Sequence, residues 1–475
     1  MLFLLLACKP NTDTHLGTGE SLPDCKIQSG EIPMEEAASV IISNSLQPGL
    51  YLGSGTSSCD LDGDGHQDLL VSGNIGAQYR GAIGVFYGPA TEWPRELDLS
   101  EADSLIQGGV GTALLGTTLD CGDLDGDGFG DIVAGTGEAF DGEGIDNDFG
   151  LHIWYGSEQR LAPSTTELEA DAALYYDYGL EPSYTIHYMN VLVADLDADG
   201  REELALAAND SADRESGRDR IFLLEGGRHS SGLLTSAAST IWGLPGKDVV
   251  LNAVDLGEPG RALMLDYGAL SDPASMVLRQ PLGLASESYA EEHSWLDLEL
   301  GKSTDIMGST RVITTQDGPI FVTAAWDETL AYAFLLVSET LEEGYVLATD
   351  LGKTGETPIV DSIIGAVYPV GDYNGDGVED LGAEMYMNGN SADPYQAAGV
   401  LDGSLLATPG LPLESLLLSS FRLGGRTDNR DADQGFADFD GDRCPDLYLG
   451  DMYYSAANDS GQDDGRVFVL LSSRR

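Results

Sequence analysis

Residues 123–131 read Asp123-Leu-Asp-Gly-Asp-Gly-Phe-Gly-Asp131, and the apolar run Ile-Val-Ala-Gly follows directly. Each loop of this kind carries side-chain oxygens at its positions 1, 3, 5 and 9 and leads into a strand-like apolar run. Five such loops in one chain indicate a repeated structural unit rather than chance acidic turns. The other four begin at Asp60, Asp195, Asp372 and Asp438.

The spacing of these loops predicts the number of repeats. Neighbouring loops start 63, 72 and 66 residues apart, whereas Asp195 and Asp372 are separated by 177 residues, or three intervals of 59. Two degenerate copies without the full set of acids fit this gap, and we place them near Asp255 and Asp317. The sequence therefore predicts seven repeats of about 60 residues.

Each repeat contains short strand-like runs. One run enters the acidic loop and a second leaves it, a third follows (for example 81–88 and 150–156), and a fourth is weaker (102–108). Short runs that are rich in β-branched and aromatic residues and bounded by glycine are typical of strands. Seven repeats of four strands predict an all-β fold, a seven-bladed β-propeller of four-stranded blades.

The last repeat holds only three strands, the third at 465–471, and residues 38–44 look like the missing fourth strand. Their pairing would close the ring and cover two open sheet edges. We therefore divide the chain into a truncated signal segment at 1–8, a polar tether at 9–32 and the propeller at 33–475.

The acidic loops have the chemistry of calcium sites. Ca²⁺ prefers oxygen ligands, and glycines at positions 4 and 6 let a short loop curl around it. We expect about five Ca²⁺, each bound by side chains at positions 1, 3, 5 and 9 and by the backbone carbonyl at position 7. The last loop departs from the pattern at Arg443 and Pro445. The predicted ligands are Asp60, Asp62, Asp64, His66 and Asp68; Asp123, Asp125, Asp127, Phe129 and Asp131; Asp195, Asp197, Asp199, Arg201 and Glu203; Asp372, Asn374, Asp376, Val378 and Asp380; and Asp438, Asp440, Asp442, Cys444 and Asp446.

An EF-hand is the main alternative for these loops. It requires a bidentate Glu at position 12 and flanking helices. Position 12 is apolar here and lies in a strand-like run each time: Val71, Ala134, Leu206, Ala383 and Leu449. The pattern excludes an EF-hand.

With these loops and strands, residues 33–475 resemble the FG-GAP or VCBS repeat family, which includes the seven-bladed propeller at the head of integrin α subunits and its bacterial relatives. The resemblance rests on the DxDGDGxxD loops and their spacing. It implies calcium loops on one face of the propeller and ligand binding on the other. It carries no metal site over to the repeats near Asp255 and Asp317, which lack the acids.

The sequence Leu5-Leu-Ala-Cys8 resembles a bacterial lipobox and predicts lipidation of Cys8. It departs from a full signal, because no charged region precedes it and its apolar run is short. The alternative is a free cysteine after a few apolar residues. We expect an extracytoplasmic protein, either an outer-membrane or cell-surface lipoprotein or a secreted protein.

Four further cysteines suggest two disulfides, for which three connectivities are open. Cys59 and Cys121 stand at nearly equivalent points of neighbouring repeats, which favours Cys59–Cys121 together with Cys25–Cys444. No CxxC spacing supports a zinc site.

The net charge and the absence of catalytic sequence motifs exclude several classes of function. A net charge of −57 argues against nucleic-acid binding and against docking on anionic lipid through a basic patch, so membrane contact is expected only through a lipid at Cys8. The six histidines form no motif, and no GxSxG, HExxH or P-loop pattern occurs. We predict a non-enzymatic, calcium-stabilised adhesion module that binds a protein or a glycan. The alternatives are an extracellular carbohydrate-active enzyme (lyase or hydrolase) on a calcium-binding propeller and a purely structural role.

The predicted binding face lies opposite the calcium loops, where the connections between second and third strands vary in length. Tyrosine and arginine are favoured at recognition surfaces, although some of these side chains could instead pack in the core. The candidate residues are Tyr79, Arg80, Tyr176, Tyr395, Tyr453 and Tyr454.

Overall fold

The structure is a computed structural model. It describes residues 25–26, 31–46, 49–73, 80–109, 113–137, 150–175, 189–209, 219–243, 249–254, 260–267, 274–278, 296–299, 304–315, 318–327, 332–338, 346–350, 362–374, 376–387, 395–406, 413–422, 432–452 and 465–474.

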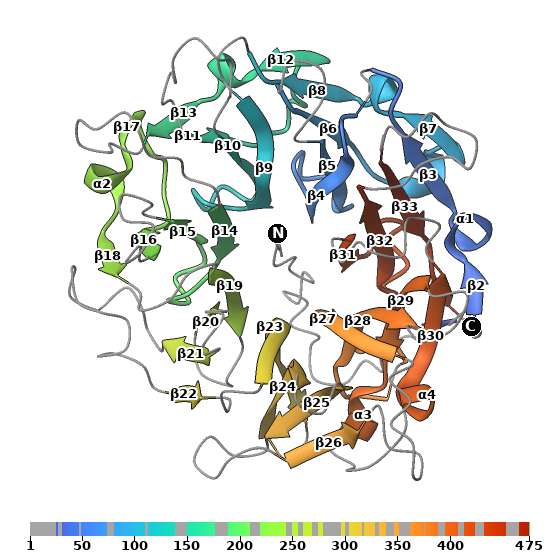
Figure 1. Cartoon of the computed structure of the whole chain (residues 1–475). Helices are drawn as coiled ribbons and strands as arrows, with labels where there is room; N and C mark the ends of the chain where they lie inside the picture. The colour runs from blue at the N-terminus through green and yellow to red at the C-terminus, as the bar shows by residue number, and fades with distance from the viewer. Residues whose placement is uncertain are drawn as a thin grey trace.

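The described strands form sheets that are arranged around a common centre (Figure 1). Seven of these sheets have four or five strands, and a further two-stranded sheet pairs β1 (Cys25–Lys26) with β34 (Ser473–Arg474). Within each larger sheet, consecutive strands pair in antiparallel order, as in the first sheet. Sheets that radiate around one centre are the architecture of a β-propeller, so the predicted propeller fold is confirmed.

The strand bounds follow the predicted repeats. Around the first three acidic loops the strands are β4 (Leu52–Cys59), β5 (Asp68–Gly73), β6 (Ala82–Phe86) and β8 (Ser104–Gln107); β9 (Ala113–Gly122), β10 (Asp131–Gly137), β11 (Gly150–Trp154) and β13 (Ala172–Tyr175); and β14 (Met189–Ala194), β15 (Glu203–Asn209), β16 (Asp219–Leu224) and β18 (Thr240–Gly243). The two degenerate repeats contain β19 (Val249–Val254), β20 (Ala262–Tyr267), β21 (Ala274–Leu278) and β22 (Leu296–Glu299), and then β23 (Thr304–Thr315), β24 (Gly318–Asp327), β25 (Tyr332–Ser338) and β26 (Val346–Asp350). The last two repeats contain β27 (Ser362–Gly371), β28 (Asp380–Met387), β29 (Tyr395–Leu401) and β30 (Leu417–Arg422), and then β31 (Ala432–Ala437), β32 (Asp446–Asp451) and β33 (Arg466–Leu470).

The degenerate repeats keep their strands where the acids are missing. Strands pair on both sides of the positions that we predicted to be degenerate, β19 with β20 and β23 with β24. Asp255 and Asp317 themselves lie outside the described residues.

The last sheet takes its fourth strand from the other end of the chain. Strand β3 (Val40–Ser43) pairs antiparallel with β33, and Ile41 lies opposite Phe468. Both side chains are buried in one apolar cluster. This is the pairing that the sequence predicted for residues 38–44.

Four sheets also carry a fifth strand that the sequence did not predict. Strands β12 (Ser164–Thr166), β17 (Gly232–Leu233) and β7 (Glu96–Asp98) each come from the connection between the third and fourth strands of one sheet. They pair in parallel with the outer strand of the preceding sheet, which is β8, β13 and β3 respectively. Strand β2 (Glu31–Pro33) pairs with β30 in the same way. These added strands cover sheet edges and tie neighbouring sheets together.

The described helices are single turns in the connections, so the fold is mostly β rather than all-β. Several side chains stabilise these turns locally; for example, Asp98 accepts a hydrogen bond from the amide of Ser100, and its own amide donates to Glu101. None of the described helices is long and apolar enough to cross a membrane. The turns are α1 (Met34–Ala37), α2 (Leu234–Ala237), α3 (Gly403–Leu406), α4 (Leu413–Leu416), η1 (Ala90–Glu92), η2 (Leu99–Glu101) and η3 (Glu167–Glu169).

The core lies between adjacent sheets. One buried cluster joins β5 to the sheet of β33 and includes Val71, Val469 and Phe439. Another runs from the first sheet to the third and includes Leu119 and Val191. Apolar packing between sheets holds the loops at their ends in fixed positions.

Candidate metal centre

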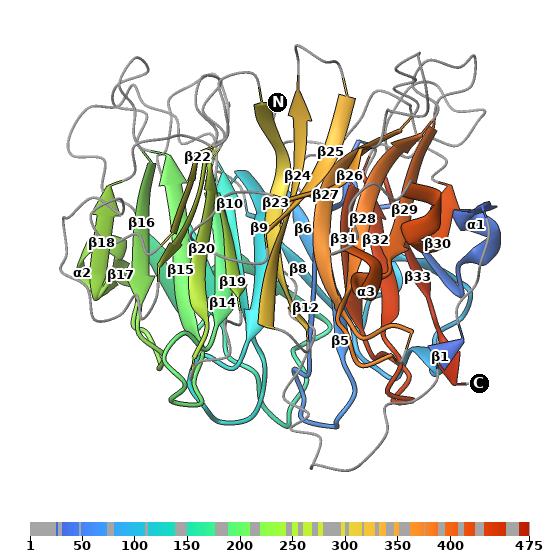
Figure 2. The ribbon, with the colours of Figure 1, turned by 90° about the horizontal axis from the view of Figure 1, so that it is seen from below.

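The acidic loops connect the first and second strands of their sheets. Because successive strands run antiparallel, these connections fall at one end of the sheets, along the lower edge in Figure 2. The connections between second and third strands fall at the opposite end. The fold thus collects the acidic loops on one face.

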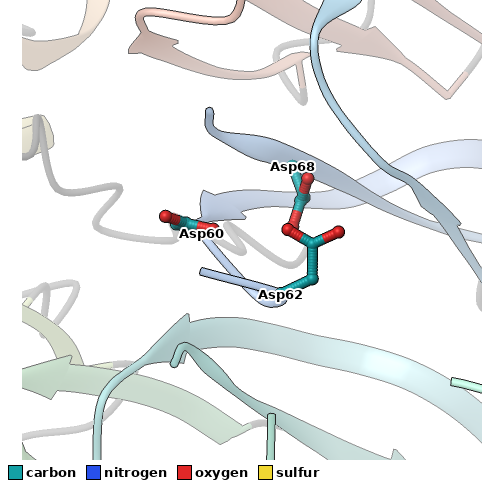
Figure 3. Close-up of side chains that lie close together, drawn as sticks. All are labelled: Asp60, Asp62 and Asp68. Carbon is teal, nitrogen blue, oxygen red and sulfur yellow. The ribbon is translucent and has the colours of Figure 1, made fainter. Parts of the chain in front are cut away.

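Side chain-to-backbone hydrogen bonds shape each loop. In the first loop, Asp60 Oδ1 accepts from the amide of Gly63 at 2.7 Å and Asp60 Oδ2 accepts from that of Gly65 at 2.9 Å. Asp62 and Asp64 each accept from the amide two residues on. Figure 3 shows the carboxylates of Asp60, Asp62 and Asp68 gathered at this turn. Such local turns are typical of Asp, so the loop sequence specifies its own shape.

The other four loops repeat these hydrogen bonds. Asp123, Asp195, Asp372 and Asp438 each accept from the amide five residues on. In the last loop, Arg443 replaces the glycine at position 6 and adopts its left-handed conformation, with φ of 69°. This loop therefore keeps the same shape despite its different sequence. In the loop at Asp372, the carboxamide of Asn374 accepts the hydrogen bond that a carboxylate accepts elsewhere.

The acid at position 9 links each loop to its own sheet. Asp68 Oδ2 accepts from the amide of Leu61 at 2.8 Å, and its Oδ1 accepts from the amide of Gly88, which follows the third strand. Asp131, Glu203, Asp380 and Asp446 make the equivalent pairs of contacts. All five side chains are buried. The position-9 acid is thus a structural strut as well as a predicted ligand.

Burial raises the pKa of the position-9 acids. Burial raises the pKa of Asp68, Asp131, Glu203 and Asp380 to about 7 and that of Asp446 to about 8, although amide hydrogen bonds lower each value in part. The other carboxylates of the same loop raise the pKa of Asp68 and of Asp446 further. A bound cation would favour the ionised form of such a carboxylate.

Four loops bring three carboxylates together. In each group, one oxygen from each residue lies within 4.8 Å of the others. Hard oxygen donors at this separation fit a hard cation such as Ca²⁺ and do not suit a soft metal. The residues that would hold it are Asp60, Asp62 and Asp68; Asp123, Asp125 and Asp127; Asp195, Asp197 and Asp199; and Asp438, Asp440 and Asp446.

Neighbouring loops contact one another in a regular way. The position-8 amide of one loop donates to the position-1 carbonyl of the preceding loop: Gly130 to Asp60 at 2.7 Å and Glu202 to Asp123 at 2.9 Å. The position-7 side chain also lies against the position-4 glycine of the preceding loop. A Cβ at Gly63 would lie 2.6 Å from Phe129 Cε1, and its φ of +73° also favours glycine. The loops form a connected row along the face.

Three position-7 residues therefore have side-chain contacts in addition to their predicted backbone role. His66 lies against Gly441, Phe129 against Gly63 and Arg201 against Gly126. For Val378 the amide donates to Asp376. Their carbonyls remain predicted ligands.

A disulfide joins the ends of two loop-bearing strands. Cys59, at the end of β4, is bonded to Cys121 in β9, with Cα atoms 6.0 Å apart. The pairing predicted from the repeat is confirmed. Cys444, buried in the last loop, is also disulfide-bonded, and the side chain of its predicted partner Cys25 lies outside the part of the chain that the structure describes.

Most of the predicted ligand face falls outside the described residues. Tyr79, Tyr176, Tyr453 and Tyr454 are not described, and neither is Cys8. Tyr395 begins β29, and half-buried Arg80 precedes β6, at the end opposite the acidic loops. Arg80 thus lies at the end of the sheets opposite the acidic loops, and its role in ligand binding stays a prediction.

Sequence reasoning missed two arginines at this centre. Arg160 and Arg228 reach acidic loops of a neighbouring sheet and lie over the rings of Tyr87 and Tyr155. Their signal in the sequence is the repeated Tyr-Gly pair after a third strand, at Tyr87 and Tyr155.

The similarity of this chain to known proteins is distant. No family model matches the chain. Integrin alpha-4 of Xenopus laevis is 31% identical over 169 residues, which cover 34% of this chain and 15% of that protein. Rhamnogalacturonan lyase PL11 of Bacillus licheniformis is 13% identical, with a TM-score of 0.41 over 94% of this chain and 75% of that one. The Dos1 propeller is 10% identical, with a TM-score of 0.37 over 96% of this chain and 95% of that one.

The chain is therefore a β-propeller with a distant similarity to an integrin α subunit over about a third of its length. Its Asp-rich loops could hold metal ions. The Cys59–Cys121 disulfide favours a location outside the cytoplasm.

Proposed function

We propose that this chain is a calcium-stabilised extracellular binding module. About five Ca²⁺ occupy the acidic loops on one face, and a protein or glycan binds the opposite face. The observation that carries the proposal is the row of acidic loops with one shared hydrogen-bond pattern, four of which bring three carboxylates within 4.8 Å.

The proposal includes a closed ring of seven blades. Support comes from β3, which follows the tether yet completes the sheet of β33. Further support comes from β7, which reaches back from the first sheet to pair with β3. Together these pairs join the two ends of the sheet series.

Calcium fits the extracellular location. Extracellular modules bind Ca²⁺ with Kd values of roughly 10⁻⁴–10⁻³ M, which suit the concentration outside cells. Membrane attachment through a lipid at Cys8 is part of the proposal. Metabolic labelling with a fatty-acid analogue tests it, and a Cys8→Ala variant should carry no label.

We expect binding on the opposite face because the two ends of the sheets carry different kinds of loop. Rigid acidic loops take up one end of the sheets, whereas the connections between second and third strands are free to vary. Half-buried Arg80 is one charged residue that the structure describes at that end.

An array of extracellular matrix proteins and polysaccharides, probed in the presence of calcium, tests this function. We expect binding to at least one class, with Arg80→Ala weakening it and Asp125→Asn leaving it unchanged while the protein stays folded. Asp125→Asn is the matched control, because it changes a charge on the other face. Cleavage of a polysaccharide, or loss of binding in folded Asp125→Asn alone, would contradict the proposal.

A further inference from the structure

We propose that Arg160 and Arg228 form ion pairs that a cation displaces, and we call each of these arginines a clasp. Each holds the acidic loop of the neighbouring sheet when no cation is bound, and each releases its carboxylates when a divalent cation enters. The first two loops should therefore bind calcium more weakly than the loop at Asp195. This inference rests on the proposed function, because it assumes calcium in these loops.

Arg160 spans the interface between the first two sheets. It lies between β11 and β12 and reaches back to the first loop, where its Nε pairs with Asp62 Oδ2 and its Nη2 lies 3.6 Å from Asp64 Oδ2. Its guanidinium carbon lies 4.4 Å from the centroid of the Tyr87 ring. One cationic group thus contacts two predicted calcium ligands and an aromatic face.

Arg228 repeats this arrangement one sheet further on. Its Nε pairs with Asp125 Oδ2, and its Nη2 lies 3.5 Å from Asp127 Oδ2. Its guanidinium carbon lies 4.7 Å from the centroid of the Tyr155 ring. Two separate segments thus make the same contacts. This repetition argues that the ion pair is a regular feature of these two loops and not an incidental surface pair.

A hydrogen bond beside each arginine fixes its backbone. The amide of Leu161 donates to the Tyr87 hydroxyl at 3.0 Å, and the amide of His229 donates to the Tyr155 hydroxyl. The chain then continues into β12 or β17, the strand that joins the preceding sheet. The arginine is therefore anchored whether or not its carboxylates hold it.

The position-3 acids that the arginines contact have little exposed surface. The Asp62 and Asp125 side chains are 7% and 6% exposed. In the third loop, Asp197 holds the same position and is exposed. The arginine there is Arg201 of the same loop, and it pairs with Asp199 at position 5.

The junction between the last sheet and the first has no such arginine. The amide of Ala90 donates to the carbonyl of Phe439 there, just as Gly227 donates to Leu124 before Arg228. The residue that follows Ala90 is Thr91, which is short and uncharged. Among the residues that the structure describes, the clasp thus occurs at the first two loops and not at the junction between the last sheet and the first.

The arginine and a divalent cation compete for the same carboxylate oxygens, and their charges determine the outcome. A guanidinium that contacts Asp62 Oδ2 neutralises a ligand oxygen that a cation would use, and it repels a divalent ion held a few ångströms away. The stacked tyrosine retains the released arginine nearby. Calcium must therefore displace the arginine from the first two loops, whereas the residues that the structure describes place no neighbouring-sheet arginine on Asp197.

Calcium titration calorimetry of the full chain tests this, with Arg160→Gln and Arg228→Gln combined in one variant. We expect the variant to bind the same number of ions but with affinity for two of them raised about tenfold, as expected from removing one positive charge near each site. In EDTA the variant should melt at a lower temperature than the wild type. In saturating calcium the two should melt together.

Arg95→Gln is the matched control. Arg95 also reaches a neighbouring sheet, but it donates to the backbone carbonyls of Ala38 and Glu35 rather than to an acidic loop. We expect this change to lower the melting temperature equally with and without calcium, and to leave the calcium affinities unchanged.

The outcomes separate the two proposals. Absence of calcium binding in both proteins would overturn the proposed function and, with it, the clasp. Calcium binding with equal affinities in wild type and double variant would overturn the clasp alone. A double variant that is destabilised equally in EDTA and in calcium would show an ordinary structural ion pair and would also overturn it.

Discussion

The amide of Gly130 donates a hydrogen bond of 2.7 Å to the carbonyl of Asp60, so the second acidic loop is joined by its backbone to the first. Glu202 with Asp123 and Arg261 with Asp195 continue the series. A cation that orders one loop therefore also restrains the position-8 residue of the next. Stability and metal binding should be coupled along this face.

Replacing Gly63 by alanine should destabilise the protein through contact between loops. A Cβ there would meet the ring of Phe129, and such overpacking costs about 1–3 kcal/mol. Gly65→Ala is the matched control, because Gly65 also has positive φ but a Cβ there would meet nothing within 4 Å. Urea denaturation should show a larger loss for Gly63→Ala. Equal losses would mean that the contact between loops is unimportant.

Removing the Cys59–Cys121 disulfide should lower stability substantially. The bond closes a loop with a sequence separation of 62 residues, for which chain entropy predicts about 4 kcal/mol. Because Cys59 directly precedes Asp60, the double alanine variant should also bind calcium more weakly at the first loop. Denaturation and calcium titration of this variant measure both effects. Wild-type values for both would contradict the prediction.

His152 should make the fold sensitive to mild acid. Burial lowers the pKa of His152 below its ordinary value of 6.5, and the nearby Glu167 carboxylate opposes this shift only in part. The ring packs against Trp154 and Tyr175. The unfolded chain therefore binds a proton first as the pH falls below about 6.5, and stability is lost towards acid.

The His152→Phe variant should lose part of this acid sensitivity, since phenylalanine fills the site without titrating. The comparison is made in saturating calcium, which holds the loop carboxylates ionised in both proteins. Denaturation at pH 7 and pH 5 gives the difference. An identical pH dependence in both proteins would remove His152 as the cause.

Deleting residues 33–46 should give an aggregating protein. The deletion removes β3 and so exposes the edges of β33 and β7, which otherwise pair with it. Size-exclusion chromatography measures the outcome. A soluble monomer with an intact near-ultraviolet circular dichroism spectrum would show that β3 is not needed to join the ends of the series.

The acidic loops could be predicted from the sequence because their structure is local. Asp60 bonds amides that lie three to five residues away, so the order of residues alone specifies the turn. The Cys59–Cys121 pair followed from the repeat, which places equivalent residues of neighbouring sheets side by side.

Contacts between distant residues could not be predicted in this way. Arg160 pairs with Asp62 across 98 residues, and Arg228 with Asp125 across 103. Strands β12 and β17 are only three and two residues long, too short to show a hydrophobic period. The second contact of each position-9 acid also lies beyond the loop; Asp68, for example, accepts from the amide of Gly88, 20 residues away, after the third strand of its own sheet.

The most direct test of the account compares thermal unfolding with saturating calcium and with EDTA. If each of five sites is about tenfold above its Kd, calcium contributes about 1.4 kcal/mol per site and about 7 kcal/mol in total. For a chain of 475 residues this corresponds to a fall in melting temperature of about 7 °C on chelation. That fall, reversed by added calcium, is the predicted result. A melting temperature that EDTA leaves unchanged would contradict the claim that calcium stabilises this propeller.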